Sequence, residues 1–363
     1  MKILCICPIG IGNYLLTYPA CHAIKRTRPD CSLHLLGLRE GIRDFAQSDP
    51  LWSGVHVFDP MKIKRNVFAQ AAIIGALRAE KFDASLNFFP SNKWLYNLLP
   101  LMAGIAVRYG FAYHYNPLST LSFVCSRRIP VDLELHDARQ NMHLAAAFCG
   151  NDAIAQGALV FPRLFGDKER AWALDFLNGT GPFIAVHPGS SAEHGMAYKR
   201  WAPQKFGAVA DRICRRLGAS CIVMGGAGEE PLKQAVAAAM TSPCRLLEQT
   251  SLGNTAALLS LCAVCLCNDS GLMHMASCGG TPVIAIFGPT DEKRNGPIGS
   301  QSLVIRKDMP GFPLWRAADA GNRRVPRGIN PSASLELLSA DEAWARIEPW
   351  LEHIAARPFP TRN

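Results

Sequence analysis

Short uninterrupted apolar runs recur along the chain, and each leads through a glycine-containing turn into a longer segment of helical character. Three of these runs occupy residues 3–7, 183–186 and 264–267. A strand buried on both faces of a parallel sheet has this continuous apolar pattern, because helices cover it on both sides. The pattern therefore predicts an α/β protein built on parallel sheets.

The same strand–turn–helix unit opens each half of the chain. A glycine turn at residues 10–12 begins a helix that runs to about residue 28, and the second half has its turn at residues 187–191. A chain of 363 residues can form two ordinary domains. We therefore expect two Rossmann-like domains that face a central cleft, residues 1–165 and 166–340. A C-terminal helix and tail, residues 341–363, should pack back on the N-terminal domain.

The strand at residues 264–267 ends in the turn Asn268-Asp269-Ser270-Gly271, which begins a short helix. Asp269 or Ser270 can cap this helix, and Gly279-Gly280 ends it. Its free N–H groups would lie at the carboxyl end of a strand, where open α/β sheets bind ligands and where an anion is stabilised. Ser270 and His274 are four residues apart and share one helix face. The stretch therefore predicts a phosphate site.

The overall charge indicates the class of partner. The chain carries a formal net charge of +9 and is 49% hydrophobic, which favours a globular protein whose partners are polyanionic, such as nucleotides, phosphorylated glycans or an anionic membrane surface. The chain has no nucleic-acid-binding signature. We also expect no signal peptide and no segment long enough to span a bilayer.

Thirteen cysteines are scattered through the chain, many of them inside apolar runs. This usage is typical of buried free thiols in a cytosolic protein. Cys262, Cys265 and Cys267 have a spacing that could suggest a metal site, but strand alternation would turn Cys265 and Cys267 into a core. We therefore expect no metal.

The stretch from residue 269 to residue 290 resembles glycosyltransferase family 9, the ADP-heptose:lipopolysaccharide heptosyltransferases. The family has an Asp-Ser/Thr-Gly-x-x-His turn, here Asp269 to His274, followed by Gly-x-Pro-x-x-x-x-Phe-Gly-x-Thr, here Gly280 to Thr290. Further matching segments appear in the family's order over about residues 1–300. They lie at residues 12–20, 82–87, 108–111, 187–201 and 225–229.

This resemblance implies the GT-B architecture, with the acceptor on the N-terminal domain and the nucleotide sugar on the C-terminal one. The reaction would be an inverting transfer of a heptose or related sugar from an ADP-sugar to a lipopolysaccharide core or similar glycan. The ADP-sugar is a substrate, so no cofactor is implied. We expect a cytoplasmic protein that could contact the inner membrane at its cytoplasmic face.

The resemblance also assigns the donor site. Lys199 would meet the nucleotide diphosphate and, with the N–H groups of Gly271 and Leu272, stabilise the leaving group. Glu229 would hold the ribose hydroxyls, with Glu230 as the alternative by a one-residue slip. The remaining donor-binding residues are Ser190 in the Gly/Ser turn, Asp269 and Ser270 in the second turn, and His274 against phosphate.

The acceptor site departs from the family at one position. The family reads Gly-Asp where this chain has Gly12-Asn13, so asparagine stands at the place of the presumed catalytic base. An amide cannot accept a proton at neutral pH. A basic group opens the helix that follows residue 65; its members are Lys62, Lys64 and Arg65. They either form a solvated helix start or cradle acceptor phosphates, because Lys and Arg suit anionic groups; the resemblance implies the second role.

Three consequences of Asn13 stay open. Another group could be the base, with Asp44 and His187 as candidates; Asn13 could orient the acceptor hydroxyl; or the protein could bind donor without turnover. A nicotinamide oxidoreductase is the rival enzyme class. It is disfavoured by Leu15 at the third glycine position of the dinucleotide fingerprint and by the basic Arg39 after the second strand.

Overall fold

The computed structural model describes the chain except for residues 8–9, 38–39, 59–65, 114–116, 179–180, 191–192, 300, 316–324, 326 and 356–363. The described chain divides into two compact units. The first comprises residues 1–162, and the second comprises residues 163–315 together with the described residues from 325 onward.

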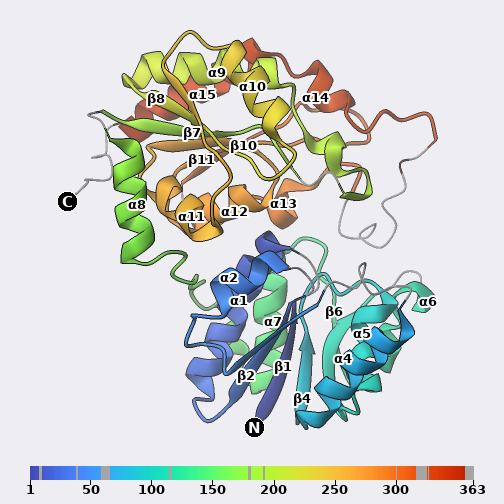
Figure 1. The fold of residues 1–363 in the computed structure, drawn as a ribbon. Helices are drawn as coiled ribbons and strands as arrows, with labels where there is room; N and C mark the ends of the chain where they lie inside the picture. The colour runs from blue at the N-terminus through green and yellow to red at the C-terminus, as the bar shows by residue number, and fades with distance from the viewer. Residues whose placement is uncertain are drawn as a thin grey trace. The chain divides into compact units, whose positions relative to one another are not determined.

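Each unit contains one six-stranded sheet in which every pair of neighbouring strands is parallel. The first sheet has the order β3-β2-β1-β4-β5-β6, and the second has the order β12-β11-β10-β7-β8-β9. Counted from its own first strand, each sheet thus has the Rossmann order 3-2-1-4-5-6. The prediction of an α/β fold with two Rossmann-like halves is confirmed (Figure 1).

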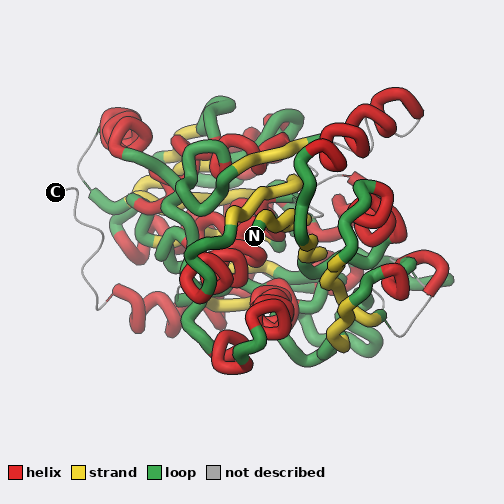
Figure 2. The backbone as a smooth tube through the Cα atoms, turned by 90° about the horizontal axis from the view of Figure 1, so that it is seen from below, coloured by secondary structure: helices red, strands yellow, loops and turns green. Residues whose placement is uncertain are grey.

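The strands of the first sheet are β1 (Lys2–Cys7), β2 (Ser32–Gly37), β3 (Gly54–Val57), β4 (Ala84–Asn87), β5 (Val107–Ala112) and β6 (Arg127–Pro130). Those of the second sheet are β7 (Phe183–His187), β8 (Ser220–Val223), β9 (Cys244–Leu246), β10 (Val264–Asn268), β11 (Val283–Ile286) and β12 (Ser302–Ile305). Their alternation with helices can be followed along the backbone in Figure 2.

Helices cover both faces of the first sheet. On one face α1 (Ile11–Thr27) packs against α7 (Asp137–Cys149). On the other face α4 (Val67–Ala79) and α5 (Trp94–Met102) pack on the sheet. Their core joins Leu77, Tyr96 and Leu99 to Leu4 and Ile6 of β1, and Figure 1 shows the two helices on the same side of the strands. The short helices of this unit are α2 (Arg43–Ala46) and α6 (Pro117–Thr120).

The second sheet is covered in the same way. α9 (Pro203–Leu217) and α10 (Glu230–Ala238) pack together, and α15 (Ala340–Ala355) lies against α9 and β12. The helix α11 (Leu252–Ser260) contacts both α8 (Asp167–Leu177) and α12 (Gly271–Cys278). The remaining helices are α13 (Glu292–Asn295) and α14 (Ala333–Leu337).

Helix α15 differs from the expectation that the C-terminal helix packs back on the N-terminal domain. Its residues Ala343, Ile347 and Leu351 are spaced by four, so they form one stripe of the helix, and all three are buried in the core of the second unit. The stripe joins the core that contains Trp201 and Phe206. The apolar face of α15 is therefore used by the unit that contains the second sheet.

The thirteen cysteines are all free, and ten of them are buried, so the prediction of buried free thiols is confirmed. In the described part of the chain, no three His, Cys, Asp or Glu side chains come together as a metal site would require.

The packing of α15 gives a stability prediction. Replacing Ile347 by Ala should lower the free energy of unfolding by about 2–5 kcal/mol, because it opens a cavity in a packed core. The exposed neighbour Glu348 provides the control, and Glu348→Ala should change stability by no more than about 0.5 kcal/mol. Urea unfolding of both variants measures the difference. Equal effects would contradict the packing of α15 on the second unit.

Candidate functional site

The site predicted in the second half lies where the strand order of the second sheet reverses. β7 and β10 are neighbours there, with Cys267 of β10 in register with His187 of β7. Asn268, the last residue of β10, holds the segment between β7 and α9. Its Nδ2 donates to Pro188 O at 2.7 Å, and its Oδ1 accepts from Trp201 N at 3.0 Å. Open α/β sheets bind ligands outside the strand ends at this switch point.

Ser270 is the N-cap of α12, and its Oγ accepts from the N–H of Met273 at 3.4 Å. Gly271 and Leu272, which follow it, are only partly buried, and the first turn of the helix has no acidic side chain. Their N–H groups belong to the set that an α-helix leaves without an intrahelical partner. The N-terminus of α12 thus has the character of an anion site, as the sequence predicts.

Glu229 is buried beside this turn and is held by three donors. Its Oε2 accepts from the N–H of Gly226 at 2.7 Å and lies 3.2 Å from His187 Nε2, while its Oε1 lies 3.2 Å from Arg200 Nη2. Burial raises the pKa of this carboxyl, but His187, the Gly226 N–H and Arg200 outweigh burial and lower it. Glu229 is therefore an ionised carboxylate, whereas Glu230 pairs with Lys233.

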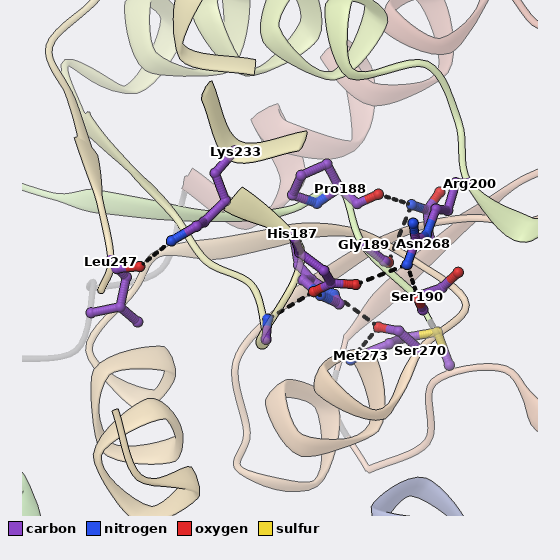
Figure 3. Close-up of polar contacts among 12 residues, drawn as sticks. His187, Pro188, Gly189, Ser190, Arg200, Lys233, Leu247, Asn268, Ser270 and Met273 are labelled. Carbon is purple, nitrogen blue, oxygen red and sulfur yellow. Dashed lines mark hydrogen bonds and ion pairs between the residues drawn. The ribbon is translucent and has the colours of Figure 1, made fainter. Parts of the chain in front are cut away.

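His187 connects the two groups described so far. Its Nδ1 lies 3.1 Å from Ser270 Oγ, and its Nε2 lies 3.2 Å from Glu229 Oε2; Figure 3 shows the His187 side chain above Ser270. Both ring nitrogens are thus engaged within the site. The sequence suggested His187 only as a candidate base, and these contacts favour a positioning role.

Gly189 makes room for the Glu229 carboxylate. A Cβ atom built at residue 189 would lie 2.1 Å from Glu229 Oε1 and 2.4 Å from its Oε2. These distances are far below van der Waals contact, so a side chain at 189 would displace the carboxylate from His187. Residue 189 must therefore be glycine so that the Glu229 carboxylate can approach the backbone of this turn closely.

Lys199 forms a second ion pair, with Asp269. Its Nζ lies 2.8 Å from Asp269 Oδ2, and the other carboxylate oxygen accepts from Asn295 Nδ2 at 3.2 Å. Burial raises the pKa of Asp269, but the charge and hydrogen bond of Lys199, followed by the charge of His274, lower it overall. Lys199 is itself mostly buried, so a cation is fixed beside the N-terminus of α12.

The remaining donor candidates are also placed in this unit. Ser190 is buried, and its Oγ donates to the carbonyl of Met196 at 3.3 Å, while its own carbonyl accepts from Arg200. His274 is buried in α12, one turn after Ser270. Ser190, Lys199, Glu229, Asp269, Ser270, Gly271 and His274 therefore all come from segments that follow β7, β8 and β10.

Three polar residues of the site were not proposed from the sequence: Arg200, Asn268 and Asn295. Arg200 directly follows Lys199 in the chain, and Asn295 lies in a short helix without a motif. Asn268 had a visible signal, because it is an uncharged polar residue that ends an otherwise apolar strand. Such a residue has to find hydrogen-bond partners when it is buried.

The acceptor candidates belong to the first unit. Gly12 and Asn13 lie in the first turn of α1, which follows β1, and both are partly buried. Asp44 lies in α2, but its side chain is outside the described part of the structure. Lys62, Lys64 and Arg65 are also outside the described residues.

The Lys199–Asp269 pair generates a prediction on stability. Lys199→Ala should cost about 3–5 kcal/mol at neutral pH, because it leaves a buried carboxylate without its cation. The double variant Lys199→Ala/Asp269→Asn, which removes both charges, should recover part of this loss. Chemical unfolding of the three proteins measures the effect, and a double variant less stable than Lys199→Ala would contradict it.

The same pair sets a pH dependence. A carboxyl whose folded pKa is depressed contributes stability above its unfolded pKa, about 4, and loses that contribution as pH falls through the folded pKa. The stability gap between the wild type and Lys199→Ala should therefore be full at pH 7 and shrink as pH falls, first as Asp269 protonates in the variant, where burial without the cation raises its pKa, and then as it protonates in the wild type. A gap that does not change with pH would show that the Asp269 charge is not its cause.

Comparison with known proteins identifies the family. The profile of glycosyltransferase family 9 (heptosyltransferase) matches residues 70–317. Lipopolysaccharide heptosyltransferase 2 of Escherichia coli K12 is 26% identical over 362 residues, which cover 94% of this chain and 98% of that protein. Lipooligosaccharide heptosyltransferase 2 of Haemophilus influenzae is 32% identical over 170 residues, or 45% of this chain and 48% of that protein.

Two solved structures show the same fold. Escherichia coli ADP-heptose lipopolysaccharide heptosyltransferase II matches with a TM-score of 0.72 and 19% identity, over 97% of this chain and 99% of that one. A family 9 glycosyltransferase from Veillonella parvula matches with a TM-score of 0.77 and 19% identity, over 97% of both chains. The predicted GT-B fold class is thereby confirmed, and with the profile matching most of its length, the chain belongs to glycosyltransferase family 9 (heptosyltransferase).

Proposed function

We propose that this glycosyltransferase moves a heptose or related sugar, with inversion, from an ADP-sugar to a hydroxyl of a lipopolysaccharide core or similar glycan. The observation that carries the proposal is the buried network at the switch point of the second sheet, where Glu229 and Lys199 flank the N-terminus of α12. The names of the relatives from Escherichia coli and Haemophilus influenzae support the sugar and the acceptor.

In this proposal the nucleotide sugar binds to the second unit. Glu229 is charged and has its oxygens turned toward donors, so it can exchange Arg200 or His187 contacts for the ribose hydroxyls. The diphosphate would lie at the N–H groups of Gly271 and Leu272, near Lys199. As the bond to the sugar breaks, negative charge grows on the diphosphate, and fixed donors stabilise charge most where it develops.

Asp269 and His274 complete the donor site. Asp269 holds the Lys199 ammonium in place, so the lysine need not be reoriented when the substrate arrives. His274 lies on the same side of α12 as Ser270, one turn further along, and would contact a phosphate. Ser190 would act through its loop, because its hydroxyl and its carbonyl both tie that loop together.

The acceptor would bind to the first unit, with Gly12 and Asn13 next to its reacting hydroxyl. Lys62, Lys64 and Arg65 would cradle its phosphate groups. We propose that Asn13 leaves a working transferase in which another group takes the proton or Asn13 only orients the hydroxyl. The alternative is a protein that binds the ADP-sugar without turnover. The domain limits proposed from the sequence, 1–165 and 166–340, match this division of labour.

We also propose that the enzyme acts at the cytoplasmic face of the inner membrane, where it would meet a lipid-linked acceptor. Among the described residues, no helix has the length and apolar character needed to cross a bilayer. Attachment would then be peripheral.

Donor binding can be tested with ADP. A ligand that binds only the folded state stabilises it, by about 2.7 kcal/mol at a hundred times its Kd, so ADP should raise the Tm. Glu229→Ala should weaken this shift, and Gly189→Ala should do the same because its Cβ displaces the carboxylate. Gly226→Ala is the matched control, since a Cβ there would lie 3.8 Å from Glu229 Oε2. An unchanged shift in Glu229→Ala would remove this carboxylate from the donor site.

The role of Asn13 can be tested by Asn13→Asp. The first turn of α1 has no acidic residue, and a helix N-terminus favours a carboxylate there, so the fold should tolerate the change. If Asn13 replaces a lost base, the substitution should raise kcat at least tenfold, about 1.4 kcal/mol of barrier. Asn13→Ala is the control. If the wild type transfers rapidly and Asn13→Asp is slower, the base lies elsewhere.

A further inference from the structure

Helix α4 has an apolar surface on the side that faces away from its own core. Its sequence, from Val67 to Ala79, contains no charged residue before Arg78. Leu77 is its one fully buried side chain, whereas Val67 is 67% exposed and Phe68 is 85% exposed. A helix that covers a sheet normally carries polar and charged residues on its outer side, as α9 does with the exposed Arg215 and Arg216. On α4 the exposed positions between Phe68 and Arg78 are alanine and glycine.

The N-terminus of α5 continues this surface. α4 and α5 pack on the same face of the first sheet, and Arg78 of α4 donates to the carbonyl of Met102 at the end of α5. Both helices connect parallel strands, so they run in the same direction and their N-termini lie at the carboxyl edge of the sheet. That edge presents Val67 and Phe68 of α4, and Trp94 of α5, which is 49% exposed.

Charge is concentrated in the same part of the chain. Residues 61–130 contain nine Lys and Arg and two Asp and Glu, so they carry +7 of the total formal charge of +9. Lys2 binds both acidic side chains of this segment: its ammonium pairs with Glu80, and its backbone N–H donates to Asp83. The described basic residues Lys93, Arg127 and Arg128 are exposed.

We propose that Val67, Phe68 and Trp94, with the exposed alanines Ala71 and Ala72, form a surface that docks on a bilayer containing anionic lipids. Exposed aromatic and aliphatic side chains at a helix end enter the interface between headgroups and acyl chains, and nearby Lys and Arg are attracted to anionic headgroups. The surface would hold the carboxyl edge of the first sheet, where the helix of Asn13 also begins, toward a membrane-embedded acceptor.

A second copy of the chain is the other occupant that an apolar helix face could accept. A symmetric dimer through this surface would bring two copies of the same basic region together. Like charges then oppose association, whereas an anionic bilayer is attracted to the region. The charge distribution therefore favours the membrane.

Vesicle binding tests the docking surface with the full chain. The protein should float with vesicles of phosphatidylethanolamine and phosphatidylglycerol in about 0.1 M salt and detach as salt rises, because screening weakens the attraction. It should bind vesicles of phosphatidylcholine alone much less. Val67→Ser/Phe68→Ser should lower the partition coefficient at least tenfold, since two large apolar groups no longer enter the interface. Lys93→Glu should lower it on anionic vesicles only.

The control is Leu337→Ser, which removes another exposed apolar side chain, 58% exposed, from α14 of the second unit. It should bind vesicles like the wild type. Equal binding by the wild type and Val67→Ser/Phe68→Ser would overturn the proposal. So would a concentration-dependent dimer in sedimentation equilibrium that this double variant abolishes, because the occupant would then be a second copy.

The inference rests on the proposed function for its purpose, but the experiment separates the two. The ADP-induced rise in Tm and transfer to a detergent-solubilised acceptor should stay intact in Val67→Ser/Phe68→Ser. If the wild type does not bind vesicles but ADP still raises its Tm, the docking surface is contradicted and the proposed function stands. If the wild type binds vesicles but ADP does not raise its Tm, the docking surface stands and the proposed donor binding is contradicted.

Discussion

The burial of two carboxylates at one end of the second sheet is the constraint on which the site depends. Glu229 and Asp269 are largely removed from water, and an ionised carboxylate in such a place is costly unless donors and cations surround it. Each has its own set: His187, Arg200 and the Gly226 N–H for Glu229, and Lys199 with Asn295 for Asp269. The net effect in both cases is a lowered pKa.

This arrangement fixes the loops as well as the side chains. His187 ends β7 and contacts the N-cap residues of both α12 and α10, so one imidazole links three strand–helix connections. The Asn268 side chain at the end of β10 links a further pair of backbone groups, Pro188 O and Trp201 N. Trp201 is in turn buried in the core, where its Nε1 donates to Leu338 O at 3.0 Å. The polar site is thus anchored directly to the apolar core.

The central strands were predictable because both of their faces are covered. β1 and β10 are buried along nearly their whole length, and their sequences are continuous apolar runs. The edge strands β6 and β9 escaped prediction for the opposite reason. β6 reads Arg-Arg-Ile-Pro and β9 is only three residues long with an exposed arginine at its centre. Such strands are defined by a neighbour's hydrogen bonds rather than by their own pattern, so a single sequence carries little signal for them.

The residues of the candidate site also differ in how far the sequence could predict them. Turn residues such as Ser270 and Gly271 were accessible from the sequence, because a strand followed by a cap and a glycine has a local physical meaning. The contact of His187 with Ser270 spans 83 residues and that with Glu229 spans 42. These distances in sequence are closed by the parallel register of β7 with β10 and by the position of β8 on the other side of β7. No local pattern contains that register.

The two sheets have the same topology, yet their switch points differ in chemistry. At the second, the turns after β7, β8 and β10 bring acidic and basic side chains together, and the charges compensate one another within the unit. At the first, the turn after β1 leads into a helix whose first turn carries no acid, with the amide Asn13 where a carboxylate could have been stabilised. A cluster of charges that compensate one another is compatible with the proposed binding of a nucleotide diphosphate, whose oxygens would replace internal partners. An uncharged helix start offers no proton acceptor of its own, so under the proposed function acid–base chemistry at the acceptor has to draw on a group outside that turn.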